Sequence, residues 1–215
     1  MEPRAAPGGL RGERRPVVEA EVEIAARPET VFSYFSDPER FRRWMGEGSA
    51  IAPAPGGDIG VGGPGGPPAT GRILEWVTNE RVVFSGTAPG VPEDARSRVT
   101  VLFAAVPGGT RVTLRHSGIP SEGARREHAG VWRALLAKLS MATAADQEAG
   151  KLDRMADASL AAWSERDRER RAKLLDESWS AKPSFRDPFA FVNGREALDA
   201  HIEMPGEKGR NRNPY

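Results

Sequence analysis

The chain has 215 residues, enough for one large domain or two small ones, and its 39% hydrophobic and 28% charged residues are ordinary for a globular protein. A net charge of +1 offers no long-range field to gather nucleic acid or anionic lipid. The lack of cysteine excludes disulfides and thiolate chemistry. The lack of any run of about 18 apolar residues disfavours a membrane span. We therefore expect a cytoplasmic protein with neither nucleic acid nor membrane as a partner.

Residues 1–16 are interpreted as a disordered lead-in. They place four arginines among prolines and glycines and lack the apolar core that a secretory signal requires. From Val17 to Ile24, apolar residues alternate with three glutamates, and this period of two predicts a strand with one solvated face. Two short helices follow, one opened by Pro28 and one running from Pro38 to Trp44.

A segment rich in glycine and proline lies between Pro53 and Gly71. It holds eight glycines and five prolines in nineteen residues. Glycine raises the entropy lost on ordering, and proline removes a backbone donor, so a regular strand is disfavoured. The composition therefore predicts a loop.

Two hairpins are predicted after this segment. The first joins extended runs at 71–77 and 81–87, and its alternation places Leu74 and Trp76 inward with Glu75 outward. The second turns at the Pro-Gly-Gly sequence of residues 107–109. Its returning strand carries an apolar face that ends in His116.

The first long helix is predicted from Ser121 to about Leu139. Its apolar stripe recurs at helical spacing and consists of His128, Trp132, Leu135, Leu136 and Leu139. An antiparallel sheet with one apolar face and a helix with one apolar stripe bury each other. We therefore expect this helix to cover the sheet.

The pattern changes after Ser140, where a small and polar stretch is consistent with a linker or with an extension of the helix. The next helix carries one apolar face, formed by Leu152, Met155, Ala156, Ser159, Leu160 and Trp163. A further helix with Leu175 and Trp179 inward, two short extended pieces, and a closing helix near 194–202 follow. Residues 203–215 are polar and without pattern.

Several of these pieces in order resemble the SRPBCC superfamily, in its branch of START-related domains similar to the heat-shock chaperone ATPase activator. The carrying motifs are Arg27-Pro28-Glu29, Val31-Phe32, Phe41 through Trp44, Gly71, Ile73-Leu74-Glu75, Arg81 through Phe84, Gly109 through Leu114, His116 through Pro120, His128, Gly130 and Trp132. The resemblance implies an α+β helix-grip domain over residues 17–142, an antiparallel sheet wrapped on a long C-terminal helix. Paired strands are usual for the family where this chain has residues 53–71, and Gly56-Gly57-Asp58 is a candidate remnant of them.

The segment 153–202 resembles the start of a SnoaL-like domain of the nuclear transport factor 2-like superfamily. The carrying residues are Ala162-Trp163, Glu165 through Asp167, Leu175, Trp179, Phe185 through Pro188 and Asn193 through Leu198. Only about half of that fold is present, so we expect a partial domain over residues 143–202 with an irregular tail over 203–215. A half-domain with apolar side chains left uncovered favours self-association.

The candidate ligand-binding residues are Trp44, Trp76, His116, His128 and Trp132. Tryptophan combines a large apolar area with one polar N–H, and Trp44 is the candidate for the lip of a pocket. The two histidines are interpreted either as a proton-transfer pair or as buried core histidines. Without a third ligand they leave a zinc shell incomplete, so no metal is predicted, and no sequence pattern indicates a cofactor.

These features favour a protein that binds a small apolar or aromatic molecule and is not an enzyme. One alternative is a polyketide cyclase or aromatase-like enzyme, which requires a strongly perturbed ionisable group facing the cavity. A second alternative, a chaperone co-factor, requires an exposed apolar surface. The abundance of alanine, arginine, glycine and proline is typical of a GC-rich bacterial genome and disfavours a eukaryotic co-chaperone role.

Overall fold

The computed structural model describes residues 16–62, 69–86, 97–188 and 190–203. Residues 1–15 of the predicted lead-in and residues 204–215 of the predicted tail lie outside the described residues. The chain divides into two compact units, unit 1 up to Ala145 and unit 2 from Asp146 onward. No helix in the described ranges is long and apolar enough to span a bilayer.

Unit 1 contains a seven-stranded antiparallel sheet in the order β1-β7-β6-β5-β4-β3-β2. The first strand, β1 (Val17–Ile24), pairs along its whole length with β7 (Gly109–Ser117), which also pairs with β6 (Ser97–Val106). Alternating burial along β1 and β7 confirms the predicted wet and dry faces of these strands. On the wet face, exposed glutamates of β1 meet arginines of β7, and such pairs add little stability.

Both predicted hairpins are present. Asn79 adopts a positive φ of 64° in the turn between β4 (Ala69–Val77) and β5 (Arg81–Gly86). Gly108, with a φ of 85°, turns the chain between β6 and β7. Thr87, the predicted end of the first hairpin, lies outside the described residues.

The loop prediction for residues 53–71 is wrong in part. The structure places β3 (Asp58–Val61) there and begins β4 at Ala69, while β2 (Ala50–Ile51) precedes them, and residues 63–68 lie outside the described part. The glycines assist pairing because they permit close backbone approach. A Cβ atom on Gly57, just before β3, would lie 2.1 Å from the Ala52 carbonyl oxygen. β3 pairs with β4 on one side and with the edge strand β2 on the other.

The prediction that Leu74 faces inward is also wrong. Leu74 is 47% exposed, whereas Ile73 is buried and Trp76 packs on the core through Phe32. The pairing of β4 with β5 shifts register between Ile73 and Glu75. Such a bulge interrupts the alternation, so two residues three positions apart face the same side of the sheet.

Two short helices precede the glycine-rich segment, as predicted. They are α1 (Pro28–Ser36) and α2 (Pro38–Met45), and the Asp37 carboxylate caps α2 by accepting hydrogen bonds from the backbone N–H groups of Glu39 and Arg40. Between them these helices supply much of the core of unit 1.

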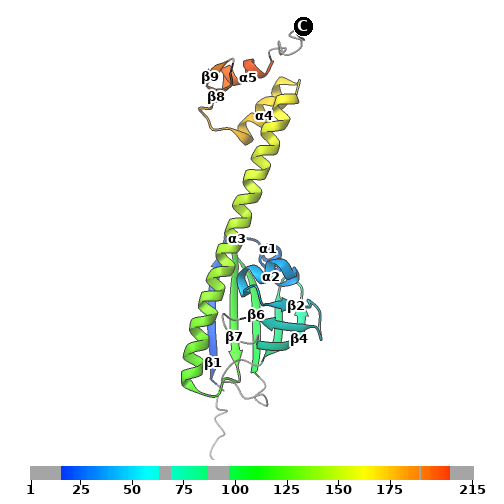
Figure 1. Ribbon diagram of the computed structural model, residues 1–215, viewed down its shortest axis with the longest axis vertical. Helices are drawn as coiled ribbons and strands as arrows, with labels where there is room; N and C mark the ends of the chain where they lie inside the picture. The colour runs from blue at the N-terminus through cyan, green and yellow to red at the C-terminus, as the bar shows by residue number, and fades with distance from the viewer. Residues whose placement is uncertain (1–15, 63–68, 87–96, 189, 204–215) are drawn as a thin grey trace, which may run out of the picture. The chain divides into compact units, whose positions relative to one another are not determined.

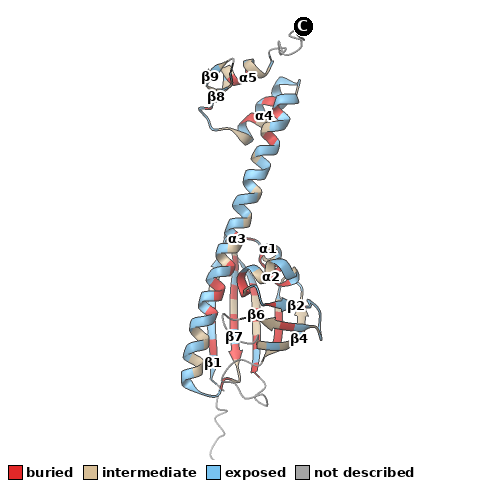
Figure 2. Ribbon diagram, viewed as in Figure 1, coloured by how far each residue is buried: buried red, intermediate tan, exposed pale blue. Residues whose placement is uncertain are grey.

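The long helix α3 runs without interruption over Glu122–Ser164, so the stretch after Ser140 is a helix extension rather than a linker. Figure 1 shows its first part alongside the sheet strands of unit 1, and Figure 2 shows buried positions on both the strands and this part of the helix. The predicted stripe residues Trp132, Leu135, Leu136 and Leu139 are buried in the same core as the sheet. The α+β class and the helix covering the sheet are confirmed.

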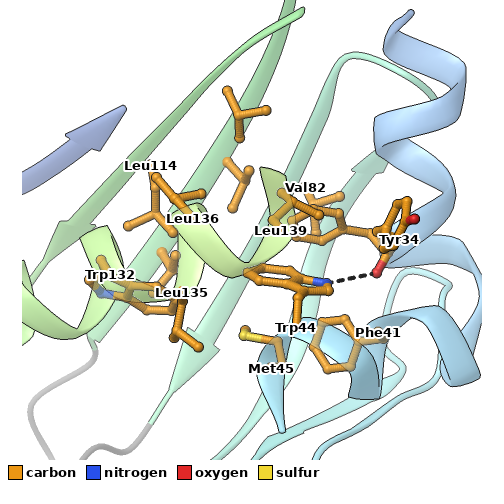
Figure 3. Packing of buried hydrophobic residues seen from close by; sticks show 14 of the residues in the cluster. Tyr34, Phe41, Trp44, Met45, Val82, Leu114, Trp132, Leu135, Leu136 and Leu139 are labelled. Carbon is orange, nitrogen blue, oxygen red and sulfur yellow. Dashed lines mark hydrogen bonds between the residues drawn. The ribbon is translucent and has the colours of Figure 1, made fainter. Parts of the chain in front are cut away.

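The aromatic residues of α1 and α2 form the densest part of this core. Trp44 is fully buried and lies 5.0 Å from Phe35 and 5.8 Å from Phe41 between ring centroids. Figure 3 shows its indole near Leu139, with Nε1 donating a 3.1 Å hydrogen bond to the Tyr34 carbonyl oxygen. That carbonyl is among the last four of α1, which have no partner within a helix.

Unit 2 contains the end of α3, then α4 (Arg168–Ser178), the paired strands β8 (Ser184–Arg186) and β9 (Phe191–Asn193), and α5 (Arg195–Glu203). Its small core consists of Ala162, Leu175 and Leu198 with partly buried neighbours. Phe189, the first residue of the second predicted extended piece at 189–192, lies outside the described residues.

The predicted apolar face of the last part of α3 is wrong in part. Leu152 and Leu160 are 57% and 72% exposed, while Ala158 and Ala162 are buried. Small side chains permit close approach of neighbouring elements, so the buried stripe need not be the one with the largest residues. Next to this core, buried Arg171 pairs with Asp199 at 2.6 Å and with Glu203 at 2.9 Å.

Candidate ligand-binding site

Unit 1 contains a cavity of about 830 Å³, within the usual range for small-molecule sites. Its walls come from the end of α2, the strands β3 to β7 and one face of α3. The lining residues are Met45, Gly46, Glu47, Gly48, Ile59, Val61, Gly62, Ala69, Thr70, Gly71, Phe84, Ser85, Gly86, Ser97, Val99, His116, Glu127, His128, Val131, Trp132, Ala134, Leu135 and Lys138.

The structure brings three of the five candidate residues to this cavity. His116 from β7 and His128 and Trp132 from α3 line it together. Trp44 and Trp76 do not line it. The fully buried position of Trp44 makes it a core residue rather than a lip, and its neighbour Met45 lines the cavity instead.

Sequence reasoning missed most of the remaining wall. Ile59 and Val61 belong to the segment that was predicted as a loop, and Phe84 of β5 and Val99 of β6 were not among the candidate residues. Glycines occupy several lining positions, where the absence of a side chain leaves space. The unusual glycine content before β4 was the available signal, since glycine in strands marks close approach of backbone or ligand.

His116 is the polar centre of the site. It is 3% exposed, and its Nδ1 accepts a 3.1 Å hydrogen bond from Trp132 Nε1. The His128 ring lies 5.3 Å away between centroids in an edge-to-face arrangement. Burial, with a smaller contribution from nearby His128, lowers the pKa of His116 from its usual 6.5 to about 4. His116 is therefore neutral at pH 7.

The hydrogen bonds define the tautomers of both rings. Tryptophan Nε1 can only donate, so Nδ1 of His116 carries a lone pair and the neutral ring holds its proton on Nε2. His128 Nδ1 lies 2.7 Å from the Ala124 carbonyl oxygen, which can only accept, so this nitrogen carries the proton. His116 therefore carries an N–H donor on Nε2, while the Nδ1–H of His128 is engaged by its own helix.

Among the described residues, no three histidine or carboxylate side chains lie close enough together to hold a metal ion.

The lowered pKa makes unfolding of unit 1 sensitive to pH. Because the folded-state pKa is near 4 and the unfolded value near 6.5, the unfolded chain binds the proton more readily between these limits. The contribution of His116 to stability is fully present above pH 6.5 and decreases as the pH falls toward 4, by about 3 kcal/mol in total. Urea unfolding of the wild-type protein and of His116→Phe from pH 7.5 to 4.5 should show a slope difference that belongs to His116. Parallel curves would contradict the burial of this imidazole.

Comparisons with known proteins are consistent with this architecture. A family model described as Activator of Hsp90 ATPase homolog 1-like protein matches residues 25–143. No curated protein matches the sequence of this chain.

Solved structures match across unit 1. An AHSA1-like protein of Rhizobium etli is 32% identical, with a TM-score of 0.50 over 60% of this chain and 82% of that one. A protein of Mesorhizobium loti is 21% identical, with a TM-score of 0.54 over 59% of this chain and 96% of that one. The Aha1 dimer of Colwellia psychrerythraea is 18% identical, with a TM-score of 0.54 over 60% and 96%.

The sequence identities of the last two structures are low enough that they show the fold alone, and this fold confirms the helix-grip architecture. The family model covers more than half of the chain. Through residues 25–143, this chain belongs to the Activator of Hsp90 ATPase homolog 1-like protein family.

Proposed function

We propose that unit 1 binds a small, largely apolar molecule in the cavity between its sheet and α3. The observation that carries this proposal is a volume of about 830 Å³ walled mainly by apolar side chains, among them Ile59, Phe84 and Leu135. Burial of apolar ligand surface supplies affinity at about 25 cal/mol per Å², and a few polar groups supply orientation. His116 is one such polar group, and Trp132 orients its ring through the hydrogen bond to Nδ1.

A cyclase or aromatase-like activity is the second candidate, because His116 is a strongly perturbed ionisable group in the cavity wall. However, a general base works best when its pKa is near the working pH. With a pKa of about 4 and one nitrogen engaged by Trp132, His116 is a weak base at pH 7 and better suited to donate a hydrogen bond. The site therefore favours binding over proton transfer.

The chaperone co-factor alternative remains a proposal at the level of the family. A co-factor of this kind acts through a protein interface, and fold membership does not transfer such a partner. The cavity supplies a direct argument for small-molecule binding and none for a protein interface.

For unit 2, we propose a SnoaL-like origin from its order of elements, a helix pair, a short hairpin and a closing helix. Its partly exposed aromatic and aliphatic residues, such as Phe191 and Leu160, support self-association through this unit.

A pair of alanine substitutions on α3 tests binding in unit 1. Ala134 lines the cavity and Ala137, one turn later, is exposed and does not line it. Ala134→Trp should occupy part of the cavity and weaken binding of the neutral fluorescent probe N-phenyl-1-naphthylamine at least tenfold, about 1.4 kcal/mol. Ala137→Trp adds the same side chain outside the cavity and should leave the affinity unchanged.

The measurement is a fluorescence titration of the wild-type protein and both variants. Saturable binding with one probe per chain, lost in Ala134→Trp alone, is the expected result. Absence of saturable binding to the wild type, or equal affinity in the two variants, would overturn the proposal.

A further inference from the structure

One polar ring atom of His116, Nε2, has no hydrogen-bond partner among the described residues. His116 lines the cavity and is 3% exposed, and no described residue forms a hydrogen bond with its Nε2. Buried polar atoms are nearly always paired, so each exception needs a physical explanation. A buried, unpaired polar atom on a residue that lines a binding cavity is explained when a ligand is its partner.

The hydrogen bond at Nδ1 determines whether Nε2 acts as a donor or an acceptor. Trp132 Nε1 donates to Nδ1 at 3.1 Å, so the proton of the neutral ring is on Nε2. The donor comes from β7 and the tryptophan that orients it comes from α3. Because β7 fixes the backbone of His116 and α3 supplies the hydrogen bond to its Nδ1, the Nε2–H group is oriented before any ligand binds.

A neutral acceptor oxygen is the ligand group that fits this donor. A carboxylate would need to give up its hydration among apolar walls that include Val99 and Leu135, and the neutral His116 provides no charge to compensate. Lys138 also lines the cavity, but it is exposed to solvent. A hydroxyl group would add a donor of its own that also needs a partner. A ketone or similar carbonyl presents only acceptor lone pairs and brings no such requirement.

We propose that the ligand of this cavity is an apolar molecule carrying a neutral carbonyl oxygen, which accepts a hydrogen bond from His116 Nε2. This inference rests on the proposed binding function and specifies the substrate class of the same site. Trp132 acts as a positioning residue, because it selects the tautomer and does not itself need to contact the carbonyl.

The test uses two compounds of nearly the same shape, 2-acetylnaphthalene and 2-ethylnaphthalene, and the anion 2-naphthoate. Their affinities for the full-length protein are measured by displacement of N-phenyl-1-naphthylamine. The reference is the double variant His116→Phe/Trp132→Phe, which removes donor and positioning group together and leaves no indole N–H unpaired. The ratio of ketone affinity to hydrocarbon affinity should be about tenfold higher in the wild type than in this variant.

A second measurement avoids dependence on the folding of the variant. In wild-type protein labelled with ¹⁵N-histidine, the His116 Nε2–H proton should shift downfield with the ketone and not with the hydrocarbon. The anion should bind more weakly than the ketone.

The outcomes distinguish the two proposals. Equal ketone-to-hydrocarbon ratios in wild type and variant, or no shift of the Nε2–H proton when the ketone is bound, would overturn the carbonyl inference while the binding function stands. If 2-naphthoate binds more tightly than the ketone, the ligand class is anionic and the inference is wrong. If none of the compounds nor the fluorescent probe binds, both proposals are wrong.

Discussion

Replacement of Trp44 by alanine is expected to lower the free energy of unfolding of unit 1 by about 3–5 kcal/mol. The side chain is fully buried between Phe35 and Phe41, so its removal loses a large apolar area and leaves a void that close-packed neighbours fill only in part. The change also removes the hydrogen bond to the Tyr34 carbonyl at the end of α1. Urea unfolding followed by circular dichroism measures the effect.

Two further variants separate these contributions. Trp44→Phe keeps most of the apolar area and loses the donor, so it should lower stability by roughly 1–3 kcal/mol, clearly less than alanine does. Trp163→Ala, at a position 40% exposed in unit 2, should leave the unfolding of unit 1 unchanged. A Trp44→Ala protein with wild-type stability would show that the indole is not part of this core.

Substitution of Gly71 by alanine should destabilise the edge of the sheet by several kcal/mol. An ideal Cβ atom at this position would lie 1.7 Å from the backbone oxygen of Ser85, so β4 and β5 must separate or bend to accept it. Gly71 also pairs with Ile59 of β3 and lines the cavity, so binding of the fluorescent probe should weaken together with stability. Paired urea unfolding and probe titrations measure both effects.

Gly130→Ala is the matched control. Gly130 lies within α3, and no atom outside its own helix backbone and chain neighbours lies within 4 Å of the added Cβ. Alanine is the better helix former and loses less backbone entropy on folding, so this variant should gain about 0.5–1 kcal/mol. The two substitutions are chemically identical and should have opposite signs. Destabilisation of similar size in both would contradict the close approach of β4 to β5.

Much of unit 1 could be predicted because its signals are local. Glutamates alternate with apolar residues along β1, and the stripe that includes Trp132 and Leu139 recurs at helical spacing along α3. Such periods arise directly from the geometry of strand and helix and need no knowledge of distant residues. The turn at Asn79 also follows from a short local sequence.

The sheet edge was less predictable because glycine has two opposite effects on strands. The same residues that disfavour an isolated strand permit the close backbone contacts at Gly57 and Gly71. The bulge after Ile73 has a similar origin, since its register depends on pairing with β5 rather than on the sequence of β4. These features appear only when neighbouring strands are in place.

Periodicity, together with the family resemblance, thus identified the α+β class, the long helix and the two histidines with Trp132 among the candidates for one site. Three-dimensional packing was needed to exclude Trp44 and Trp76 from the cavity and to show that Trp132 reaches the Nδ1 atom of His116. The reason is that a local pattern reports which face of an element is apolar, whereas the covering element determines burial, hydrogen-bond partners and pKa. His116 becomes a neutral, oriented donor because α3 packs over β7.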